Sequence, residues 1–142
     1  AAAYESVANA WARQPDTFIE ANYRYASALI ERAKAESKTD AQATRNEARL
    51  ILVKSITQIR NASQTDDFNY GLSGRNWISR SILLLGNFYE EEGDLAEAVA
   101  VYRLIPELNQ NLPIHESRLP GQSAAESKLA TLNASLNKIP TR

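Results

Sequence analysis

The sequence lacks cysteine and methionine altogether and has a single histidine among its 142 residues. Without cysteine the chain has no disulfide, no thiol nucleophile, no iron–sulfur cluster and no cysteine-ligated zinc. Lysine and arginine number 16 against 17 acidic residues. This balance argues against a nucleic-acid-binding protein, which is normally strongly basic. Uninterrupted apolar runs such as residues 50–53 and 82–85 are far shorter than the roughly 20 residues of a membrane-spanning helix.

The composition, 44% apolar and 23% charged, is typical of a folded globular protein, and the length predicts one domain over residues 1–142. The chain begins with Ala1 and not with methionine, which leaves two alternatives. Either a signal peptide has been removed, or the chain is a fragment or the end of a longer array. The missing cysteine and the abundant amide side chains favour an extracytoplasmic (periplasmic or secreted) location, without excluding a cytoplasmic one.

Apolar residues recur at spacings of three and four along most of the chain, which is the period of amphipathic helices. The alternating β-branched runs that are typical of strands are missing. We therefore expect an all-α fold of about six helices, at residues 3–14, 17–37, 40–62, 76–92, 94–108 and 122–138. Two long polar connections, residues 63–75 and 109–121, separate some of them.

The most specific pattern lies in residues 79–108. In order along the chain, its key residues are Leu85, Gly86, Tyr89, Gly93, Asp94, Ala98 and Tyr102. This pattern resembles a tetratricopeptide repeat, in which two antiparallel helices pack closely. Gly86 and Ala98 leave room where the helices approach each other, and Leu85, Tyr89 and Tyr102 fill the space around that contact. We expect Gly93 to take a left-handed conformation that ends the first helix, and Asp94 to cap the second.

The rest of the chain matches the repeat less closely. Pro106 comes early, inside the expected last turn of the second helix, so we expect that helix to stop short or kink. A weaker copy with longer helices lies upstream, around Ala26 and Ala48, and half-units lie at both ends. The resemblance therefore implies antiparallel hairpins stacked as a short tetratricopeptide-like αα-solenoid.

In this family the first helix of each repeat lines a groove that binds partner peptides. The resemblance therefore places Arg80, Leu83, Asn87 and Glu90 on the groove-facing positions of the clear repeat. Leu83 stands where the carboxylate-clamp version of the family needs a lysine, so recognition of a free C-terminal carboxylate is disfavoured.

Residues that suggest chemistry have simpler interpretations. His115 is a lone loop histidine, which favours a surface role over a base or ligand. Asp66 and Asp67 before Gly71 are typical of a turn, because the further ligands of a calcium loop are absent. Residues 90–92, three consecutive glutamates, form either a solvated turn or an acidic rim. A basic series on the second long helix is interpreted as a solvated face; it comprises Arg45, Arg49, Lys54 and Arg60.

No catalytic, metal-binding or cofactor-binding residues are predicted, and we expect the chain not to be an enzyme. The leading hypothesis is a protein–protein interaction or assembly module that presents a helical groove and two long loops to a partner protein or peptide. The alternative is a permanent structural subunit of a multi-protein extracytoplasmic complex or filament. A third interpretation is an auxiliary domain of an envelope hydrolase.

Overall fold

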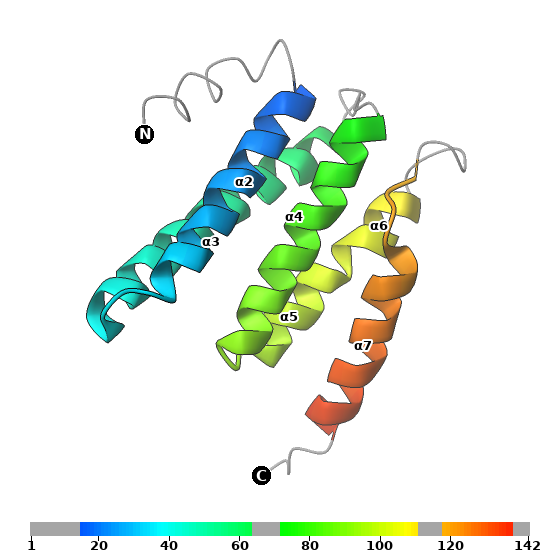
Figure 1. Cartoon of the computed structure of the whole chain (residues 1–142). Helices are drawn as coiled ribbons and strands as arrows, with labels where there is room; N and C mark the ends of the chain where they lie inside the picture. The colour runs from blue at the N-terminus through cyan, green and yellow to red at the C-terminus, as the bar shows by residue number, and fades with distance from the viewer. Residues whose placement is uncertain (1–14, 64–71, 111–117, 138–142) are drawn as a thin grey trace.

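The computed structural model of the protein describes residues 15–63, 72–110 and 118–137. Within these residues the fold is entirely helical and contains no strand (Figure 1), so the all-α prediction is confirmed. The predicted helix over residues 3–14 lies outside the described part of the chain. The helices are α2 (Pro15–Ala33), α3 (Lys38–Ser63), α4 (Leu72–Glu91), α5 (Leu95–Tyr102), α6 (Leu104–Gln110) and α7 (Gln122–Asn137).

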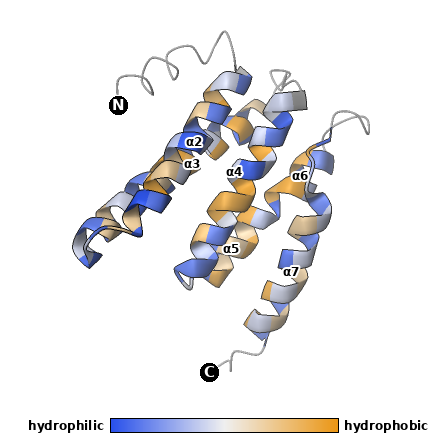
Figure 2. Cartoon of the chain, in the orientation of Figure 1, coloured by the Kyte–Doolittle hydropathy of each residue, from blue (hydrophilic) through white to orange (hydrophobic). Residues whose placement is uncertain are grey.

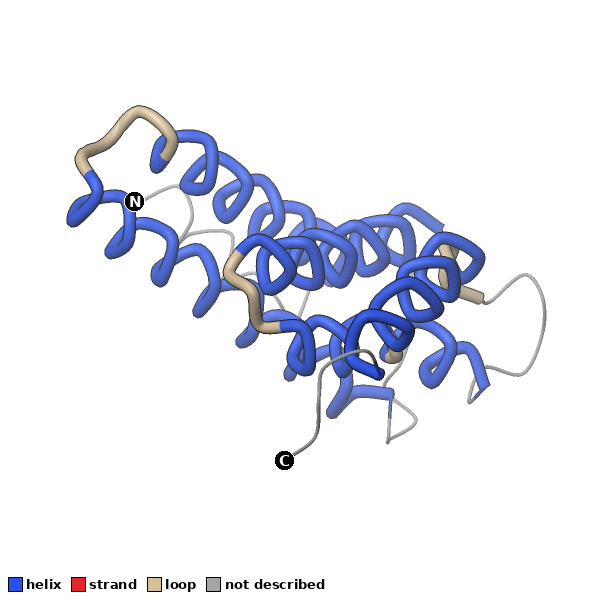
Figure 3. Tube along the Cα trace, turned by 90° about the horizontal axis from the view of Figure 1, so that it is seen from below, coloured by secondary structure: helices blue, strands red, loops and turns tan. Residues whose placement is uncertain are grey.

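Four of the helices pack as two antiparallel hairpins, each closed by a short turn. Helices α2 and α3 form one hairpin and α4 and α5 form a second, as the tube in Figure 3 shows. Helix α4 packs against both α2 and α3, whereas α7 packs against α5 and α6. Each hairpin therefore rests on its neighbour along the chain, and α7 covers the far side of the second one.

Two clusters of buried apolar side chains hold these helices together. The larger runs through all the described helices and includes Ile19, Leu52, Ile82 and Ile105, each with no measurable exposure. The smaller cluster joins α5 to α7, and its buried members are Ala98, Val99, Tyr102 and Leu132. In Figure 2 a hydrophobic stretch lies midway along α4, while the turn between α2 and α3 is hydrophilic. The amphipathic period of the sequence thus corresponds to real buried faces.

The turn between α4 and α5 ends the first of these helices in the expected way. Gly93 has a φ of +81°, in the left-handed region that a residue without Cβ adopts at low cost. The Gly93 amide donates to the Glu90 carbonyl at 3.0 Å and the Asp94 amide to the Tyr89 carbonyl at 2.9 Å, the pair of bonds of a Schellman motif. Asp94 is the N-cap residue of α5, but its side chain makes no capping hydrogen bond, so that part of the prediction is wrong.

Helices α5 and α6 are two halves of one broken helix. Only Arg103 separates them, and it keeps a right-handed helical conformation. Pro106 has no amide hydrogen to donate to the carbonyl of Tyr102, four residues earlier, and its ring is crowded by that carbonyl. The break lies directly after Tyr102, whose carbonyl lacks this partner, so the expectation that the helix stops short or kinks is confirmed.

The long connections are shorter than the sequence suggested. Residues 72–75 were expected in a loop but form the first turn of α4, and residues 109 and 110 complete α6. Gly74 is buried, and a Cβ there would lie 2.5 Å from the Asp16 side-chain carboxyl carbon. A larger residue at this position would overlap the Asp16 side chain of α2, which explains the glycine in the first turn of α4. The spacing of the sequence alone did not indicate this.

Candidate functional site

The residues predicted to pack the repeat lie where α4 meets α5. Leu85, Ala98 and Tyr102 are buried. Gly86 faces the Tyr102 ring, and a Cβ built on Gly86 would lie only 2.6 Å from Cζ of that ring. Tyr89 is half-buried and packs against both apolar clusters. Leu85 belongs to the larger apolar cluster, whereas Ala98 and Tyr102 belong to the smaller one, and Tyr89 lies against both. The ring of Tyr102 occupies the space that a side chain at position 86 would need.

The four residues predicted to line a groove on α4 have different surroundings. Arg80 and Asn87 are exposed. Leu83 is half-buried against both apolar clusters, and its Cδ1 approaches Gly121 just before α7. Glu90 is half-buried and contacts α5 and α7. Only Arg80 and Asn87 are thus exposed to a partner, and the four residues do not form one free surface.

Glu90, the first residue of the acidic triplet, is held by two other helices. Its Oε2 accepts a 2.5 Å hydrogen bond from the Tyr102 hydroxyl of α5 and lies 3.2 Å from Nζ of Lys128 on α7. Burial, and then the hydrogen bond to Glu90, raise the pKa of Tyr102 well above its usual range. This carboxylate therefore joins α4 to α5 and α7.

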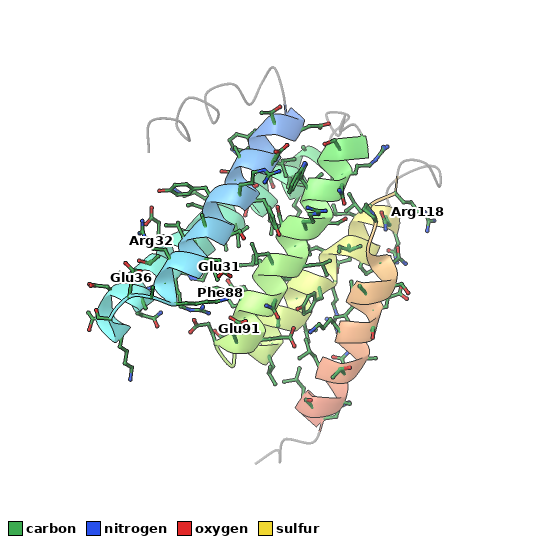
Figure 4. The ribbon with its side chains drawn as sticks, in the orientation of Figure 1. Glu31, Arg32, Glu36, Phe88, Glu91 and Arg118 are labelled. Atoms are coloured by element: carbon green, nitrogen blue, oxygen red, sulfur yellow. The ribbon has the colours of Figure 1, made fainter. Side chains whose placement is uncertain are left out.

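Glu91 and Glu92 turn the other way and pair with Arg45 of α3. Nε of Arg45 lies 2.7 Å from Oε1 of Glu92, and Nη2 lies 3.6 Å from Oε2 of Glu91. The guanidinium carbon also lies 4.5 Å from the centre of the Phe88 ring. Figure 4 labels Phe88 and Glu91 near the C-terminal end of α4.

Arg45 is accordingly not part of a solvated face, because only 19% of its side chain is exposed. The acidic triplet is likewise neither a freely solvated turn nor an open acidic rim. Its three carboxylates are shared between α3 on one side and α5 and α7 on the other. The sequence could not show this, since Arg45 and Glu92 are 47 residues apart.

A second group of aromatic and basic side chains lies where α2 and α4 run side by side. The Tyr23 and Trp77 rings are 5.4 Å apart between centroids. The guanidinium carbon of Arg24 lies 4.9 Å from the centre of the Trp77 ring, and that of Arg80 lies 4.8 Å from it. The sequence predicted a role for Arg80, but it did not relate this residue to Tyr23 and Arg24, which lie more than 50 positions earlier.

An open, mostly apolar cleft lies between α3, α4 and the α5–α6 pair. Its volume is about 210 Å³. Val53, Ile56 and Arg60 of α3 line one wall, with Tyr89 of α4 and Leu104 of α6 among the other lining residues. Thr57, Arg60 and Glu97 supply its polar side chains, and most of the other lining residues are apolar, so the cleft suits mainly apolar contact.

Among the residues that the structure describes, no group of three or more His, Asp or Glu side chains could hold a metal ion. Two sites considered from the sequence, His115 and the Asp66–Asp67 turn, lie outside those residues. None of the described helices is long and apolar enough to cross a membrane. Comparison with known proteins found no match to any protein-family model, curated protein or solved structure.

Proposed function

We propose that the chain is a tetratricopeptide-like helical-repeat segment that binds another protein and catalyses no reaction. The packing order supports this proposal: a hairpin of α2 and α3, a hairpin of α4 and α5, and then α7 against the second hairpin. A solenoid is built by repeating that step, with each unit burying its apolar face against the next. The close approach of Gly86 to the Tyr102 ring supports the tight helix crossing that the repeat pattern implies.

The observation that carries the binding role is the position of α2 and α4. Both are the first helix of a hairpin, they lie side by side, and Arg80 and Asn87 of α4 are exposed. In the family that the sequence resembles, the first helices line the groove. Helices that are already packed lose little conformational entropy when a partner binds, so such a surface suits an adaptor.

Site-specific crosslinking tests this role. A photoreactive residue is placed at Asn87, and a matched control is placed at Ala96, an exposed position on α5. We expect crosslinks to a defined protein from position 87 only, and saturable binding when that protein is purified. Equal crosslinking from both positions, or no binding by the purified candidate, would contradict the proposal.

The alternative of a permanent structural subunit has one specific observation in its favour. Leu50 is 48% exposed on α3, one helical turn from Val53 in the apolar cleft. An apolar surface of this kind suits a permanent interface. Recovery from the native source in a single stoichiometric complex, lost in a Leu50→Lys variant, would favour the subunit. Exchangeable partners and an unaffected variant would favour the adaptor. An extracytoplasmic location stays a prediction under both.

A further inference from the structure

The exposed surface shared by α2 and α4 carries positive charge on an aromatic base. We call the four residues Tyr23, Arg24, Trp77 and Arg80 the Arg–Trp patch. Both arginines are exposed, and both guanidinium groups lie within 5 Å of the Trp77 ring. Tyr23 packs at a tilt against the same ring. The patch therefore joins two helices that are distant in sequence and places two positive charges beside one aromatic ring.

The two arginines differ in how far their charge is already balanced. Nε of Arg24 lies 2.8 Å from Oε2 of Glu20, one turn earlier on the same helix, and that side chain of Arg24 is 65% exposed. Within the described part of the chain no carboxylate forms an ion pair with Arg80, whose only charge-related contact there is the Trp77 ring. The patch consequently keeps an excess positive charge centred on Arg80.

Stacking on Trp77 prepares Arg80 for an anionic ligand. A guanidinium group that lies over an aromatic ring uses its flat face for that contact, while its N–H groups remain at the edge. Those N–H groups match the two oxygens of a carboxylate, and the stacked side chain has less freedom to lose on binding. The indole beside it can contact the aliphatic part of the same ligand.

The surrounding charges select among anionic ligands. Glu20 and Glu31 of α2 and Glu91 of α4 lie on the two helices that carry the patch, and the chain as a whole has a net charge of -1. A nucleic acid or an anionic membrane would bring its negative charge against these carboxylates too. A short segment with one or two carboxylates would meet only the arginines.

We propose that the Arg–Trp patch binds an acidic peptide segment, with a side-chain carboxylate on Arg80 and an aliphatic side chain against Trp77. This inference rests on the proposed protein-binding function and specifies the partner's chemistry. Arg24 contributes less than Arg80, because Glu20 already pairs with it.

The test uses a short fluorescein-labelled peptide with two Glu residues separated by Leu, and the same peptide with Gln in place of Glu. Binding to the full chain is measured by fluorescence anisotropy. We expect saturable binding of the Glu peptide that weakens as salt is added, and no binding of the Gln peptide. Arg80→Gln should weaken the affinity about tenfold, as for one lost charge-assisted hydrogen-bonded pair. Arg24→Gln should have a smaller effect. The matched control, Arg103→Gln, changes an exposed arginine between α5 and α6 and should have none.

Three results would overturn the inference. The first is equal binding of the Glu and Gln peptides, and the second is equal loss of affinity in Arg80→Gln and Arg103→Gln. The third is Arg80-dependent binding to anionic vesicles or single-stranded DNA that exceeds binding to the Glu peptide. Circular dichroism of each variant verifies that the helices are intact. If the inference fails while crosslinking at position 87 still identifies a partner, the protein-binding function stands and only the acidic partner is rejected.

Discussion

The two hairpins use the same type of contact with side chains of different size. In the first, the Tyr25 hydroxyl donates to Oε1 of Glu47 at 3.3 Å, and the adjoining Ala26 and Ala48 are fully buried. In the second, the Tyr102 hydroxyl donates to Glu90, and Gly86 faces the ring of Tyr102. Each hairpin therefore has a tyrosine–glutamate bond beside a close approach of its helices.

The two hairpins differ in how deeply their tyrosine side chain is buried. Tyr25 is half-buried and its bond with Glu47 is exposed to solvent, whereas Tyr102 is buried because Gly86 leaves space for its ring. The first hairpin gains its contact area from length, with helices of 19 and 26 residues. In the second, α5 has only eight residues and depends on one large side chain. The helices of the longer hairpin thus approach each other at two small residues, Ala26 and Ala48. Those of the shorter hairpin meet at one small residue, Gly86, and one large residue, Tyr102.

The largest expected effect is at the close approach. Gly86→Ala should lower the free energy of unfolding by about 3 kcal/mol, because the new Cβ would overlap the Tyr102 ring in a packed core. The matched change in the first hairpin, Ala26→Gly, should cost only about 1 kcal/mol through helix propensity. Chemical denaturation measures both. Equal losses would show that the two hairpins are packed in the same way.

A smaller loss is expected where the hairpins meet. Arg45→Ala removes the contacts of α3 with Phe88, Glu91 and Glu92, and should lower the free energy of unfolding by about 1–2 kcal/mol. Lys54→Ala, at an exposed site on the same helix, should change it by less than about 0.5 kcal/mol. An Arg45 variant as stable as the lysine variant would rule out a structural role for these contacts.

The two tyrosines should differ in their response to alkaline pH. In the unfolded chain Tyr102 ionises near its ordinary pKa of 10.0, whereas in the folded protein its pKa is raised by burial and by Glu90. The unfolded state then binds fewer protons, so stability falls as pH rises above about 10. Tyr102→Phe should cost about 1 kcal/mol at neutral pH and reduce that alkaline loss.

Tyr25→Phe serves as the comparison for this pH dependence. The pKa of Tyr25 is raised by burial and by the charge of Glu47, but its bond is exposed, so the variant should lose less than about 0.5 kcal/mol. Thermal melts from neutral pH to above pH 10 separate the two variants. Identical pH profiles would argue that burial of Tyr102 does not affect its ionisation.

The smallest effects are expected at the turns. The Asp40 amide donates to Oγ of Ser37 at 3.3 Å at the start of α3, whereas Asp94 makes no side-chain cap at the start of α5. Ser37→Ala should therefore cost about 1 kcal/mol, and Asp94→Ala only a few tenths. A larger loss for the aspartate, measured by the same denaturation, would show that it caps α5 in solution.

The pattern of neighbouring residues was sufficient to predict the helices. It failed where the local structure depends on contacts with residues that are distant in the sequence. Five predicted helices correspond to described ones, and Gly93 and Pro106 act as expected, because spacing and backbone chemistry are properties of neighbouring residues. Residues 72–75 were misassigned, because Gly74 lies in a helix at a position where any larger side chain would overlap Asp16 of α2.

The sequence predicted less of the candidate site. It identified Arg80 and Asn87 as surface residues, but it also included Leu83 and Glu90, which α5 and α7 engage. Residues Tyr23 and Arg24 belong to α2, and no local pattern relates them to Trp77 of α4. Such pairs are defined by the packing of one hairpin on the other, which a single sequence does not reveal.

The glutamates at the end of α4 have a consequence for how the molecule opens. If α3 detaches, Glu91 and Glu92 lose their ion pairs with Arg45. If α7 detaches, Glu90 loses its ion pair with Lys128. Either event leaves adjacent negative charges with fewer partners at a helix end whose dipole already disfavours them. Amide hydrogen exchange in α3, α4 and α7 should then be correlated, so that neighbouring units unfold as one cooperative block.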